Sequence, residues 1–415
     1  MSGVLAMILA GGEGKRLMPL TISRSKPSVP FGGSYRLIDF VLNNFVNSGF
    51  LRIYVLTQYK SQSLYMHLKN GWSVNGIPGA FIDAIPAQMR ISREWYQGTA
   101  DAIYQNLQFI EEQYPEHVAV FGSDHIYKMD IRQMVDYHKI NDAALTVSAL
   151  RLPIDICSKR FGVIEVNTQG QMIGFEEKPL KPKEIPGDPG FCLVSMGNYV
   201  FKANVLKRVL LKDKDFPDSS HDFGRDIIPK LFKEEKVMVY NMRDNKIIGE
   251  NEDVYWRDVG TIDAYWSAHM DLLGEKPRFS MSNQKWPLHT FYPPLPPASF
   301  TDTYDHKSSV SQSLISAGCL IRGATINRSV IGFRCVAENG ANVDGCVLIG
   351  DDKIGHGAKI RNAILDRYVE IAPGFSLGYD PQQDSKLIDP NNPKGVYISP
   401  QGIIVIPQGM RLGFD

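Results

Sequence analysis

The segment "LAGGEGKRLMPLT" at residues 9–21 combines glycines with cations in a way that could bind phosphate. Its glycines are Gly11, Gly12 and Gly14. Glycines let backbone N–H groups approach an anion, and Lys15 and Arg16 add positive charge at the same turn. Two well-known phosphate loops do not fit, because a Walker loop needs glycine where Leu9 stands and a dinucleotide fingerprint needs glycine where Leu17 stands. An ordinary glycine turn with solvated cations remains the alternative.

Two further cations follow closely in "SRSKPSVPFGG", at Arg24 and Lys26. The whole chain has 45 Lys and Arg against 45 Asp and Glu, so its formal net charge is zero and this local excess of cations indicates an anion site. Pro27 keeps the backbone at Lys26 extended, which would let the ammonium reach into a cleft. An exposed loop lysine is the alternative.

Two carboxylates stand where a metal could be held near phosphates. Asp124 follows the apolar run "VAVF", and Asp258 lies in "YWRDVGTIDAYW". Mg²⁺ prefers a few carboxylate oxygens together with phosphate and water, so the pair could hold Mg²⁺ against a triphosphate. The alternatives are a turn aspartate at 124 and simple capping of the next helix by Thr261. His125 is assigned no role, since a lone histidine is more often structural.

A third group of residues could contact a sugar phosphate. In "GFEEKPLKP", Lys178 could hold the phosphate while Glu177 accepts sugar hydroxyls, although a charged surface turn would look the same. In "WYQGTADAIYQ", a helix should open at Thr99, with Gly98 allowing a ligand close to the backbone. Further polar candidates are Gln88, Ser195 and Tyr199.

The elements that must position these residues form at least two domains, because 415 residues exceed one ordinary core. The first two-thirds alternate β-rich runs with helix-like runs, which predicts a mostly parallel sheet that binds ligands at the carboxyl ends of its strands. We place this α/β domain at residues 1–275. The proline-rich stretch "TFYPPLPPASF" marks a connection at 276–310, and a second domain should span 311–415.

Residues 311–376 show a six-residue apolar period, with Val330 six before Val336 and Leu348, Ile354 and Ile360 six apart. Such a period predicts a parallel β-helix, and a small antiparallel β domain is the alternative. The period slips at Asn342, which occupies an expected apolar position.

Composition narrows the class of protein. An apolar fraction of 43% with 22% charged residues is typical of soluble globular proteins, and zero net charge argues against a nucleic-acid or membrane partner. The sequence shows no signal peptide and no run of about 18 apolar residues, so a cytoplasmic location is expected. Five cysteines without a CxxC pair are expected to be reduced, mostly buried thiols.

The order of the motifs resembles the bacterial glucose-1-phosphate adenylyltransferases, also called ADP-glucose pyrophosphorylases, over nearly the whole chain. The matching motifs are "LAGGEGKRLMPLT", "SKPSVPFGG", "PAQ", "WYQGTADA", "GSDHIYKMD", "FGVIEV", "EEKP", "SMGNYVF", "HDFGRDIIP" and "YWRDVGTIDAYW". The resemblance implies a Rossmann-like nucleotidyltransferase domain followed by a left-handed parallel β-helix. It also implies transfer of the adenylyl group of ATP to α-D-glucose 1-phosphate with Mg²⁺, the committed step of glycogen synthesis, in an allosteric homotetramer.

The resemblance also assigns roles by motif. Arg16 and Lys26 would bind the ATP phosphates, Asp124 and Asp258 would hold Mg²⁺, and Lys178 would bind the phosphate of glucose 1-phosphate. The sugar site would be lined by Tyr96, Gly162, Glu177 and Ser195. The nucleotide would contact the loop of Gly11, Gly12 and Gly14 together with Gln88, Gly98 and Thr99. Regulatory communication would involve Gln58 and Trp95.

Regulation is expected, but the effector is not fixed by the sequence. Some family members carry a lysine where this chain has Ser23, and others carry C-terminal lysines where the last sixteen residues here hold only Arg411 as a cation. Arg36 in "GGSYRLIDF" is the remaining candidate for an effector contact. A nucleotidyltransferase that uses UTP, dTTP or GTP and a non-catalytic regulatory subunit stay open as alternatives, and a fused acetyltransferase fits less well.

Overall fold

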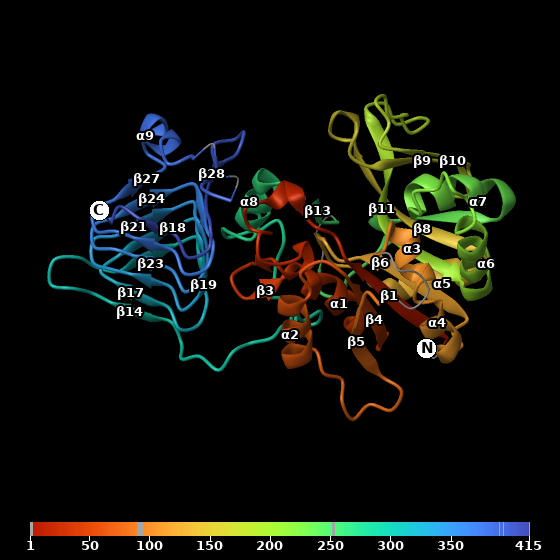
Figure 1. Ribbon diagram of the computed structural model, residues 1–415, viewed down its shortest axis with the longest axis horizontal. Helices are drawn as coiled ribbons and strands as arrows, with labels where there is room; N and C mark the ends of the chain where they lie inside the picture. Colours follow the sequence, from red (N-terminus) through yellow and green to blue (C-terminus); the bar gives the residue numbers. More distant parts are fainter. Residues whose placement is uncertain (1–2, 89–94, 251–253, 390, 393, 415) are drawn as a thin grey trace.

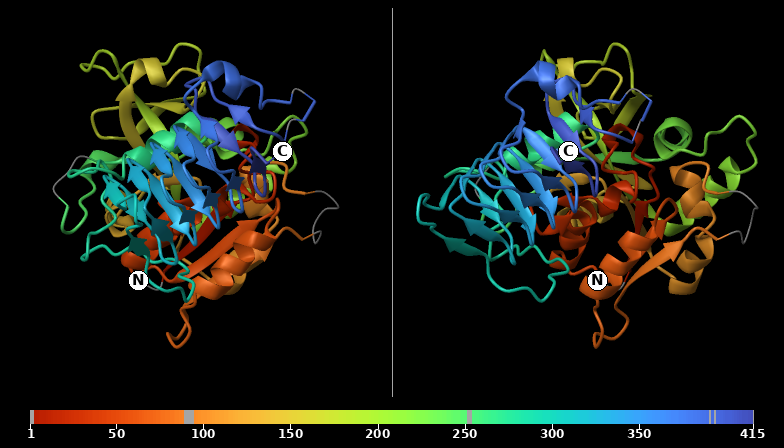
Figure 2. Two further views of the ribbon diagram at one scale, coloured as in Figure 1. Left: turned by 90° about the vertical axis from the view of Figure 1, so that its left-hand side faces the viewer. Right: turned by 60° about the vertical axis from the view of Figure 1, so that its left-hand side comes forward.

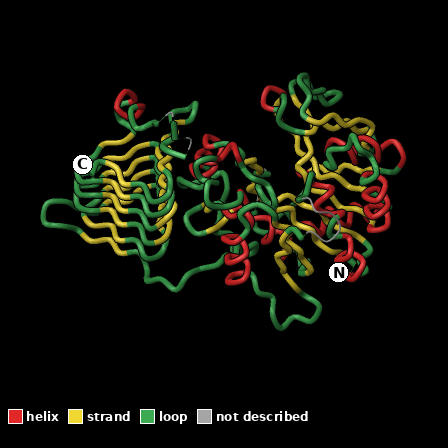
Figure 3. Tube along the Cα trace, viewed as in Figure 1, coloured by secondary structure: helices red, strands yellow, loops and turns green. Residues whose placement is uncertain are grey.

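The computed structural model describes residues 3–88, 95–250, 254–389, 391–392 and 394–414. Figure 1 shows two bodies, an N-terminal α/β body and a C-terminal stack of β-coils. Figure 3 shows that the helices belong to the N-terminal body, apart from the short α9 (Pro381–Ser385). No helix in the described ranges combines the length and the apolar character needed to cross a bilayer.

The N-terminal body is built on a nine-stranded mixed sheet. Its main path runs in the order β10 (Met172–Glu177), β9 (Gly162–Val166), β11 (Phe191–Lys202), β6 (His117–Gly122), β1 (Val4–Ala10), β4 (Arg52–Thr57), β5 (Phe81–Pro86). Off this path, β8 (Leu145–Pro153) pairs with β11 and with β12 (Val237–Asn241). The strands β6, β1, β4 and β5 are mutually parallel, whereas β11 is antiparallel to its neighbours. Half of the sheet therefore has the predicted parallel arrangement, and its carboxyl ends share one edge.

Helices cover both faces of this sheet because its strands are apolar on both sides. Adjacent residues of β1 point to opposite faces, so Ile8 packs in one core with α1 and Met7 in the other with α3. One face carries α1 (Leu37–Asn47), α2 (Gln62–Gly71) and α5 (Ile131–Ile140). The other carries α3 (Thr99–Tyr104), α4 (Leu107–Gln113), α6 (Ala203–Asp213) and α7 (Ile228–Glu234).

Short elements lie around the edge of the sheet where the parallel strands end. They comprise the 3-10 turns η1 (Lys15–Leu17), η2 (Lys26–Ser28), η3 (Ile154–Ile156) and η5 (Met242–Asp244), the π-turn η4 (Phe223–Ile227), and the small pairs β2 (Pro30–Phe31) with β3 (Tyr35–Arg36) and β7 (His125–Tyr127) with β13 (Trp256–Asp258). The helix α8 (Ile262–Met270) follows β13, and Thr261 caps it by accepting from the backbone N–H of Ala264, as predicted.

The C-terminal body is a parallel β-helix with three faces, whose coils are stacked from cyan to blue in Figure 2. The first face is made of β14 (Ser299–Thr301), β17 (Leu320–Arg322), β20 (Val336–Ala337), β23 (Lys353–Ile354), β26 (Glu370–Ile371) and β30 (Arg411–Leu412). The second is made of β15 (Ser309–Ser311), β18 (Thr325–Asn327), β21 (Asn342–Asp344), β24 (Lys359–Arg361) and β27 (Ser376–Leu377). The third is made of β16 (Leu314–Ile315), β19 (Val330–Phe333), β22 (Val347–Gly350), β25 (Ala363–Leu365), β29 (Ile404–Ile406) and the antiparallel β28 (Tyr397–Ile398).

The repeat of the β-helix corrects the register expected from the sequence. The core side chains are Ile331, Ala337, Val343, Leu348, Ile354, Ile360, Leu365, Ile371 and Leu377. The steps between them are six, six and five residues in turn, which matches the 17-residue spacing of Asn342, Lys359 and Ser376 in register along the second face. The sequence period had placed Val330, Val336 and residue 342 in the core, each one residue before the true core positions Ile331, Ala337 and Val343. The predicted core positions Leu348, Ile354 and Ile360 were correct. The apparent slip at Asn342 disappears because each coil closes with a five-residue step.

The third face of the β-helix packs its outer side against the N-terminal body. Val347, Ile364 and Val405 join a buried cluster with Phe31 and Tyr265. Because this face carries apolar residues on its outer side as well as in the core, the apolar period in the sequence could be assigned to the wrong set of residues. A buried ion pair also crosses the boundary, since Arg24 donates to Asp366 with both guanidinium nitrogens at 2.9 Å.

The connection between the two bodies is extended but not free. His289 exchanges hydrogen bonds with the Asn43 side chain, and Thr290 donates to Asp39 at 2.7 Å. Asp39 is fully buried and also accepts from Trp72 at 2.8 Å, with His67 Nε2 at 2.6 Å. The connection is therefore held on α1 by polar contacts. The strand β14 lies inside the range 276–310 that was expected to be the linker.

A buried histidine beside this interface should make stability depend on pH. His269 accepts from the Gly32 N–H at Nε2, so its other ring nitrogen donates to the Tyr265 carbonyl, and the ring is neutral. Burial lowers the pKa of His269 from 6.5 to about 4. Below pH 6.5 the histidine is protonated in the unfolded chain but stays neutral in the folded chain until the pH approaches 4. The free energy of unfolding therefore falls as the pH drops from 6.5 towards 4, and the loss from His269 is about 2 kcal/mol at pH 5.

We expect His269→Gln to flatten the dependence of the unfolding free energy on pH between 7 and 5, measured by urea titration. His356→Gln, at an exposed histidine, is the control and should keep the dependence of the parent. An unchanged pH slope in His269→Gln would contradict this account.

Candidate active site

The predicted phosphate loop leaves β1 at the carboxyl edge of the sheet. Gly14 adopts φ 69°, a left-handed conformation, and begins the turn η1 that carries Arg16. A Cβ atom at Gly14 would lie 3.0 Å from the Cβ of Lys26 and 3.0 Å from Cγ2 of Thr21. The glycine is thus required both by the backbone conformation and by the close approach of Lys26 beneath the loop. In the same loop, Glu13 forms an ion pair with Lys15 at 3.0 Å.

The predicted cation and both predicted carboxylates meet in one ion cluster. Lys26 Nζ lies 2.7 Å from Asp124 Oδ2 and 3.3 Å from Asp258 Oδ1. The lysine side chain is 8% exposed, against 37% for Asp124 and 15% for Asp258. Burial acts to lower the pKa of Lys26, but the two carboxylates outweigh it and the pKa is raised. Burial alone would raise the pKa of Asp124, but Lys26 and His125 lower it below its usual range. The shifts of Lys26 and Asp124 both favour their charged forms, so the two groups hold each other in place as an ion pair at neutral pH.

The ion cluster is assembled by pairing of β13 with β7. In this antiparallel pair Asp258 lies opposite His125, so the carboxylate from β13 reaches the end of β6 where Asp124 stands. Oxygen atoms of Asp124 and Asp258 and a ring nitrogen of His125 lie within 4.8 Å of one another. Two carboxylates beside an open cavity suit Mg²⁺ that keeps water and phosphate ligands, so the residues fit a divalent metal.

A cavity of about 520 Å³ opens beside this cluster at the carboxyl edge of the sheet. The residues that line it and were predicted from sequence are Gly11, Gly12, Lys26, Gln58, Tyr96, Gly98, Thr99, Asp124, Gly162, Glu177, Lys178, Ser195 and Tyr199. Gln58 abuts the loop, since a Cβ at Gly11 would lie 3.3 Å from its Cβ. Of the other predicted contacts, Gly14, Arg16, Gln88, Trp95 and Asp258 are not part of this lining, and the side chains of Gln88 and Trp95 are exposed.

One end of the cavity is shaped around Glu177 and Lys178. Gly162 faces Glu177 across the β9–β10 pair, and a Cβ there would lie 2.8 Å from Glu177 Oε2 and 2.5 Å from the ring of Phe175. Lys178 adopts φ 51°, an uncommon conformation for a lysine and one that clusters at functional sites. Its ammonium lies 2.6 Å from Glu177 Oε1. An anion bound here could take the place of Glu177 as the partner of the Lys178 ammonium, which would leave the Glu177 carboxylate beside it as a hydrogen-bond acceptor.

The opposite wall is set by two backbone adjustments. Gly98 precedes α3, and a Cβ there would lie 2.2 Å from the His221 carbonyl, so only glycine fits. Thr99 does open the helix as predicted, but its hydroxyl donates to Asp222 at 2.9 Å and accepts from the N–H of Phe223 at 3.0 Å. Ser195 stands at the register shift of β11, two residues before Gly197 with φ 73°.

Comparisons with known proteins agree with this architecture. The nucleotidyl transferase family model matches residues 5–275, and the model described as GlmU-like, C-terminal hexapeptide matches residues 296–406. Glucose-1-phosphate adenylyltransferase 1 of Vibrio parahaemolyticus is 59% identical over 414 residues, covering 100% of both chains. The chain belongs to the glucose-1-phosphate adenylyltransferase family. Enzymes of that name from Aliivibrio fischeri and an Anaeromyxobacter species are 58% and 43% identical, covering 100% and 99% of this chain and 100% of their own lengths.

For this glucose-1-phosphate adenylyltransferase family member, the hexapeptide match is consistent with the left-handed parallel β-helix expected from the resemblance. The nucleotidyl transferase match covers the whole mixed sheet and the ion cluster of Lys26, Asp124 and Asp258. The predicted fold class is confirmed by these matches.

The structure adds residues that the sequence reading left without a role. Asp222, Gly224 and Trp256 also line the cavity. Asp222 caps η4 by accepting from the N–H groups of Gly224 and Arg225. An aspartate directly before a helical run was therefore the sequence signal that could have identified Asp222. His125 packs against Trp256, with ring centroids 5.1 Å apart and ring planes tilted by 49°. No motif spacing could have shown this contact, because it depends on the pairing of β13 with β7.

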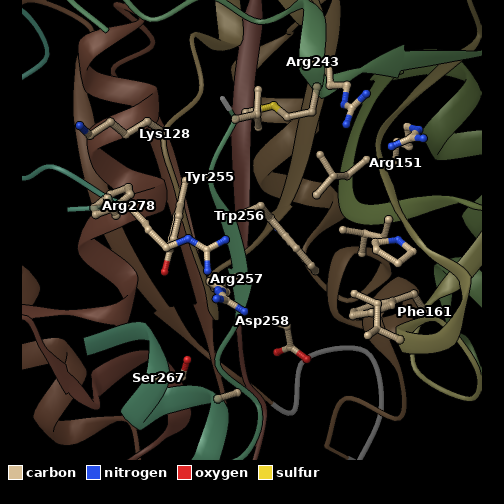
Figure 4. A pocket seen from close by; sticks show the side chains of 18 of the residues that line it. Lys128, Arg151, Phe161, Arg243, Tyr255, Trp256, Arg257, Asp258, Ser267 and Arg278 are labelled. Carbon is tan, nitrogen blue, oxygen red and sulfur yellow. The ribbon is translucent and has the colours of Figure 1, made fainter. Parts of the chain in front are cut away.

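A second, larger cavity of about 1280 Å³ adjoins the first, and the two share Arg160, Phe161 and Trp256 in their linings, whereas Asp258 lines the larger cavity alone. Figure 4 shows Arg257 and Arg278 on one side of Trp256, and Arg151 and Arg243 on the other. Arg16 lines this cavity and not the first, and its guanidinium lies near Asp258, because a Cβ at Gly260 would lie 2.9 Å from Arg16 and 3.0 Å from Asp258 Oδ1.

The candidate effector contact Arg36 lies away from both cavities, at the junction with the β-helix. Its guanidinium donates to the backbone and the hydroxyl of Ser63, each at 2.8 Å. Burial, together with the charges of Arg367 and Arg24, lowers the pKa of Arg36 to about 10 against the opposing effect of Asp39. The Nε atom of Arg367 is buried without a hydrogen-bond partner among the described residues. The sequence could not reveal this group, since its members come from both bodies.

Gly14→Ala should harm both folding and activity. A side chain at φ 69° is strained and would press on Lys26 and Thr21, so we expect a loss of about 1 to 3 kcal/mol in the unfolding free energy. Displacement of Lys26 should also reduce turnover. Gly12→Ala is the control for stability, because nothing lies within 4 Å of a Cβ at Gly12. Equal stability of the two variants would argue against this role of Gly14.

Proposed function

We propose that this protein transfers the adenylyl group of ATP to α-D-glucose 1-phosphate, giving ADP-glucose and pyrophosphate in the committed step of glycogen synthesis. The reaction is supported by relatives up to 59% identical over the full chain, which are glucose-1-phosphate adenylyltransferases by name. The structural observation that supports it most directly is the ion cluster of Lys26, Asp124 and Asp258 at the mouth of a cavity. Its charges suit two anionic substrates and a divalent metal.

In this proposal the protein acts by positioning and by neutralising charge. Arg16 and Lys26 bind the phosphates of ATP, and the glycine loop brings its N–H groups to the same phosphates. Asp124 and Asp258 hold Mg²⁺, which when bound withdraws charge from the phosphate oxygens. Gln88, Gly98 and Thr99 contact the nucleotide.

Lys178 binds the phosphate of glucose 1-phosphate, while Glu177 accepts hydrogen bonds from sugar hydroxyls. Tyr96, Gly162 and Ser195 complete the sugar site. An oxygen of the sugar phosphate then attacks the α-phosphorus in line, and pyrophosphate leaves on the opposite side. No covalent intermediate with the protein is needed, because the barrier is mainly repulsion between anions and their orientation.

Arg16 supports a direction for the leaving group. It lines the larger, cation-rich cavity beyond Asp258, whereas Lys178 lines the smaller cavity. In-line displacement places the attacking and leaving oxygens on opposite sides of the phosphorus, so the pyrophosphate side corresponds to Arg16.

We also propose regulation by an anionic metabolite that binds at Arg36, with Arg24 and Arg367 as neighbours. Burial first, and then the charges of Arg367 and Arg24, lower the pKa of Arg36 to about 10, so an anion bound beside these three arginines would relieve their mutual repulsion. Gln58 and Trp95 would communicate with the active site. The β-helix would serve assembly into a homotetramer, and the substrates and the free thiols suit a cytoplasmic enzyme.

The first test is release of pyrophosphate with glucose 1-phosphate and Mg²⁺, comparing ATP with UTP, dTTP and GTP. ATP should be strongly preferred, and ADP-glucose should appear as the product by chromatography. Preference for another nucleotide would overturn the adenylyl assignment, and inactivity with all four, with and without glycolytic metabolites as effectors, would favour a regulatory subunit.

Asp124→Asn should reduce turnover by several orders of magnitude, because it removes a metal ligand and one partner of Lys26. The melting temperature should show that the variant remains folded. The matched control is Asp136→Asn, at an exposed position on α5, which should keep turnover within about twofold of the parent. Near-normal turnover in Asp124→Asn would remove Asp124 from the mechanism.

Arg367→Gln should raise the concentration of an activating or inhibiting metabolite needed for half-maximal effect by about tenfold or more, since one charge-assisted contact is lost. Arg334→Gln is the control, because that arginine of the β-helix is occupied by Asp351 on an outer face. An unchanged effector response in Arg367→Gln would place the effector elsewhere.

A further inference from the structure

Lys26 stands between the two carboxylates that fit a divalent metal. Its ammonium contacts one oxygen of Asp124 at 2.7 Å and one oxygen of Asp258 at 3.3 Å. An ion held by these same two oxygens would lie in the gap that the ammonium occupies. The ammonium and the metal therefore compete for one position, since two cations cannot share the same pair of oxygens at contact distance.

The base of Lys26 is fixed while its side chain is free to change partners. Its backbone lies in η2, where Pro27 and Ser28 are buried, and its Cβ is covered by Gly14 of the phosphate loop. Beyond Cβ the side chain is a flexible chain of methylenes that ends in three rotatable N–H donors. Lys26 also lines the cavity beside the glycine loop, so a phosphate bound there lies within reach of the same ammonium.

Arg16 borders the same cluster from the other side. A Cβ at Gly260 would lie 2.9 Å from a guanidinium nitrogen of Arg16 and 3.0 Å from Asp258 Oδ1. The carboxylate pair is thus flanked by two cations. A metal that approaches the free protein meets both positive charges and must break both contacts of Lys26.

We propose that Lys26 acts as a placeholder for the metal: in the free protein it occupies the gap between Asp124 and Asp258, and it moves to the phosphates when the nucleotide enters. The metal and the nucleotide are then bound together, and the free protein binds a divalent ion weakly. This inference rests on the proposed function for the identity of the phosphates.

The exchange keeps the charges balanced. Two carboxylates and one ammonium carry a net charge of minus one, and the triphosphate supplies the new partner that the ammonium needs when a divalent ion takes its place. Without phosphate, the metal must displace a cation whose carboxylate partners, among the residues that the structure describes, are Asp124 and Asp258 alone. Charge-assisted contacts of this kind change an equilibrium constant by about tenfold to a hundredfold when lost.

The test is metal binding by the full-length protein without substrates, followed from the electron paramagnetic resonance signal of free Mn²⁺ and by calorimetry with Mg²⁺. Lys26→Met removes the ammonium but keeps a long side chain, and should bind Mn²⁺ about tenfold or more tightly than the parent. Lys26→Arg, which retains a cation, should bind Mn²⁺ as weakly as the parent.

The matched control is Lys128→Met. Lys128 is a buried lysine that pairs with Glu250 and donates to the Ser280 carbonyl at 2.6 Å, away from Asp124 and Asp258. Its loss should leave Mn²⁺ affinity unchanged. Asp124→Asn combined with Lys26→Met should abolish the gain, which would locate the tighter site at the carboxylate pair.

Mn²⁺ affinity that is unchanged or weaker in a folded Lys26→Met variant would overturn the proposal. A second measurement does not depend on any variant: the parent protein should bind Mn²⁺ at least tenfold more tightly in the presence of α,β-methylene ATP, and equal affinity with and without that nucleotide would also overturn it.

The outcomes separate this inference from the proposed function. ADP-glucose synthesis by the parent with no gain of Mn²⁺ affinity in Lys26→Met rejects the placeholder role alone. A gain of affinity without ADP-glucose synthesis rejects the assigned reaction and supports the placeholder role.

Discussion

The ion cluster of Lys26, Asp124 and Asp258 is the interaction on which the arrangement of the candidate site depends. Each of its three side chains comes from a different segment, and the contacts of 2.7 and 3.3 Å draw those segments together at the carboxyl edge of the sheet. Removal of the Lys26 charge would leave the carboxylates of Asp124 and Asp258 close together without compensation, which is costly where water is partly excluded. The cluster therefore fixes the position of the phosphate loop relative to β13 as well as the charges that substrates would meet.

Register is the constraint behind this cluster. Asp258 meets Asp124 only because β13 pairs with β7 with Asp258 opposite His125. A shift by one residue would turn the carboxylate to the other face, since side chains alternate along a strand. The glycines serve the same end: Gly14, Gly98 and Gly162 lie where a single Cβ would meet a neighbouring atom at 3.0 Å or less.

Much of the site could be predicted from sequence because its residues follow strand ends in short, distinctive motifs. Residues such as Lys178 and Asp124 were identified from their neighbours along the chain. Contacts between segments could not be predicted in this way, which is why the role of His125 beside Asp258 and the group of Arg36 with Arg367 emerged only from the fold.

The β-helix shows where a sequence pattern is ambiguous. Val330 and Ile331 are adjacent and both buried, one facing the N-terminal body near Gly33 and the other the β-helix core. A six-residue apolar period therefore fits two phases on the face that packs against the other body. The 17-residue length of each coil identifies the core residues, because the side chains that point into the β-helix follow one another at steps of six, six and five residues.

The segment that carries Lys26 rests on the core shared by the two bodies. Val29 and Phe31 follow Lys26 directly, and they pack in the same buried cluster as Ile364 and Val405 of the β-helix. Lys26, which we propose binds the phosphates, is thus only a few residues from side chains that pack against the C-terminal body. Because this buried cluster contains residues of both bodies, a substitution on the outer side of the third β-helix face would also disturb the segment that positions Lys26.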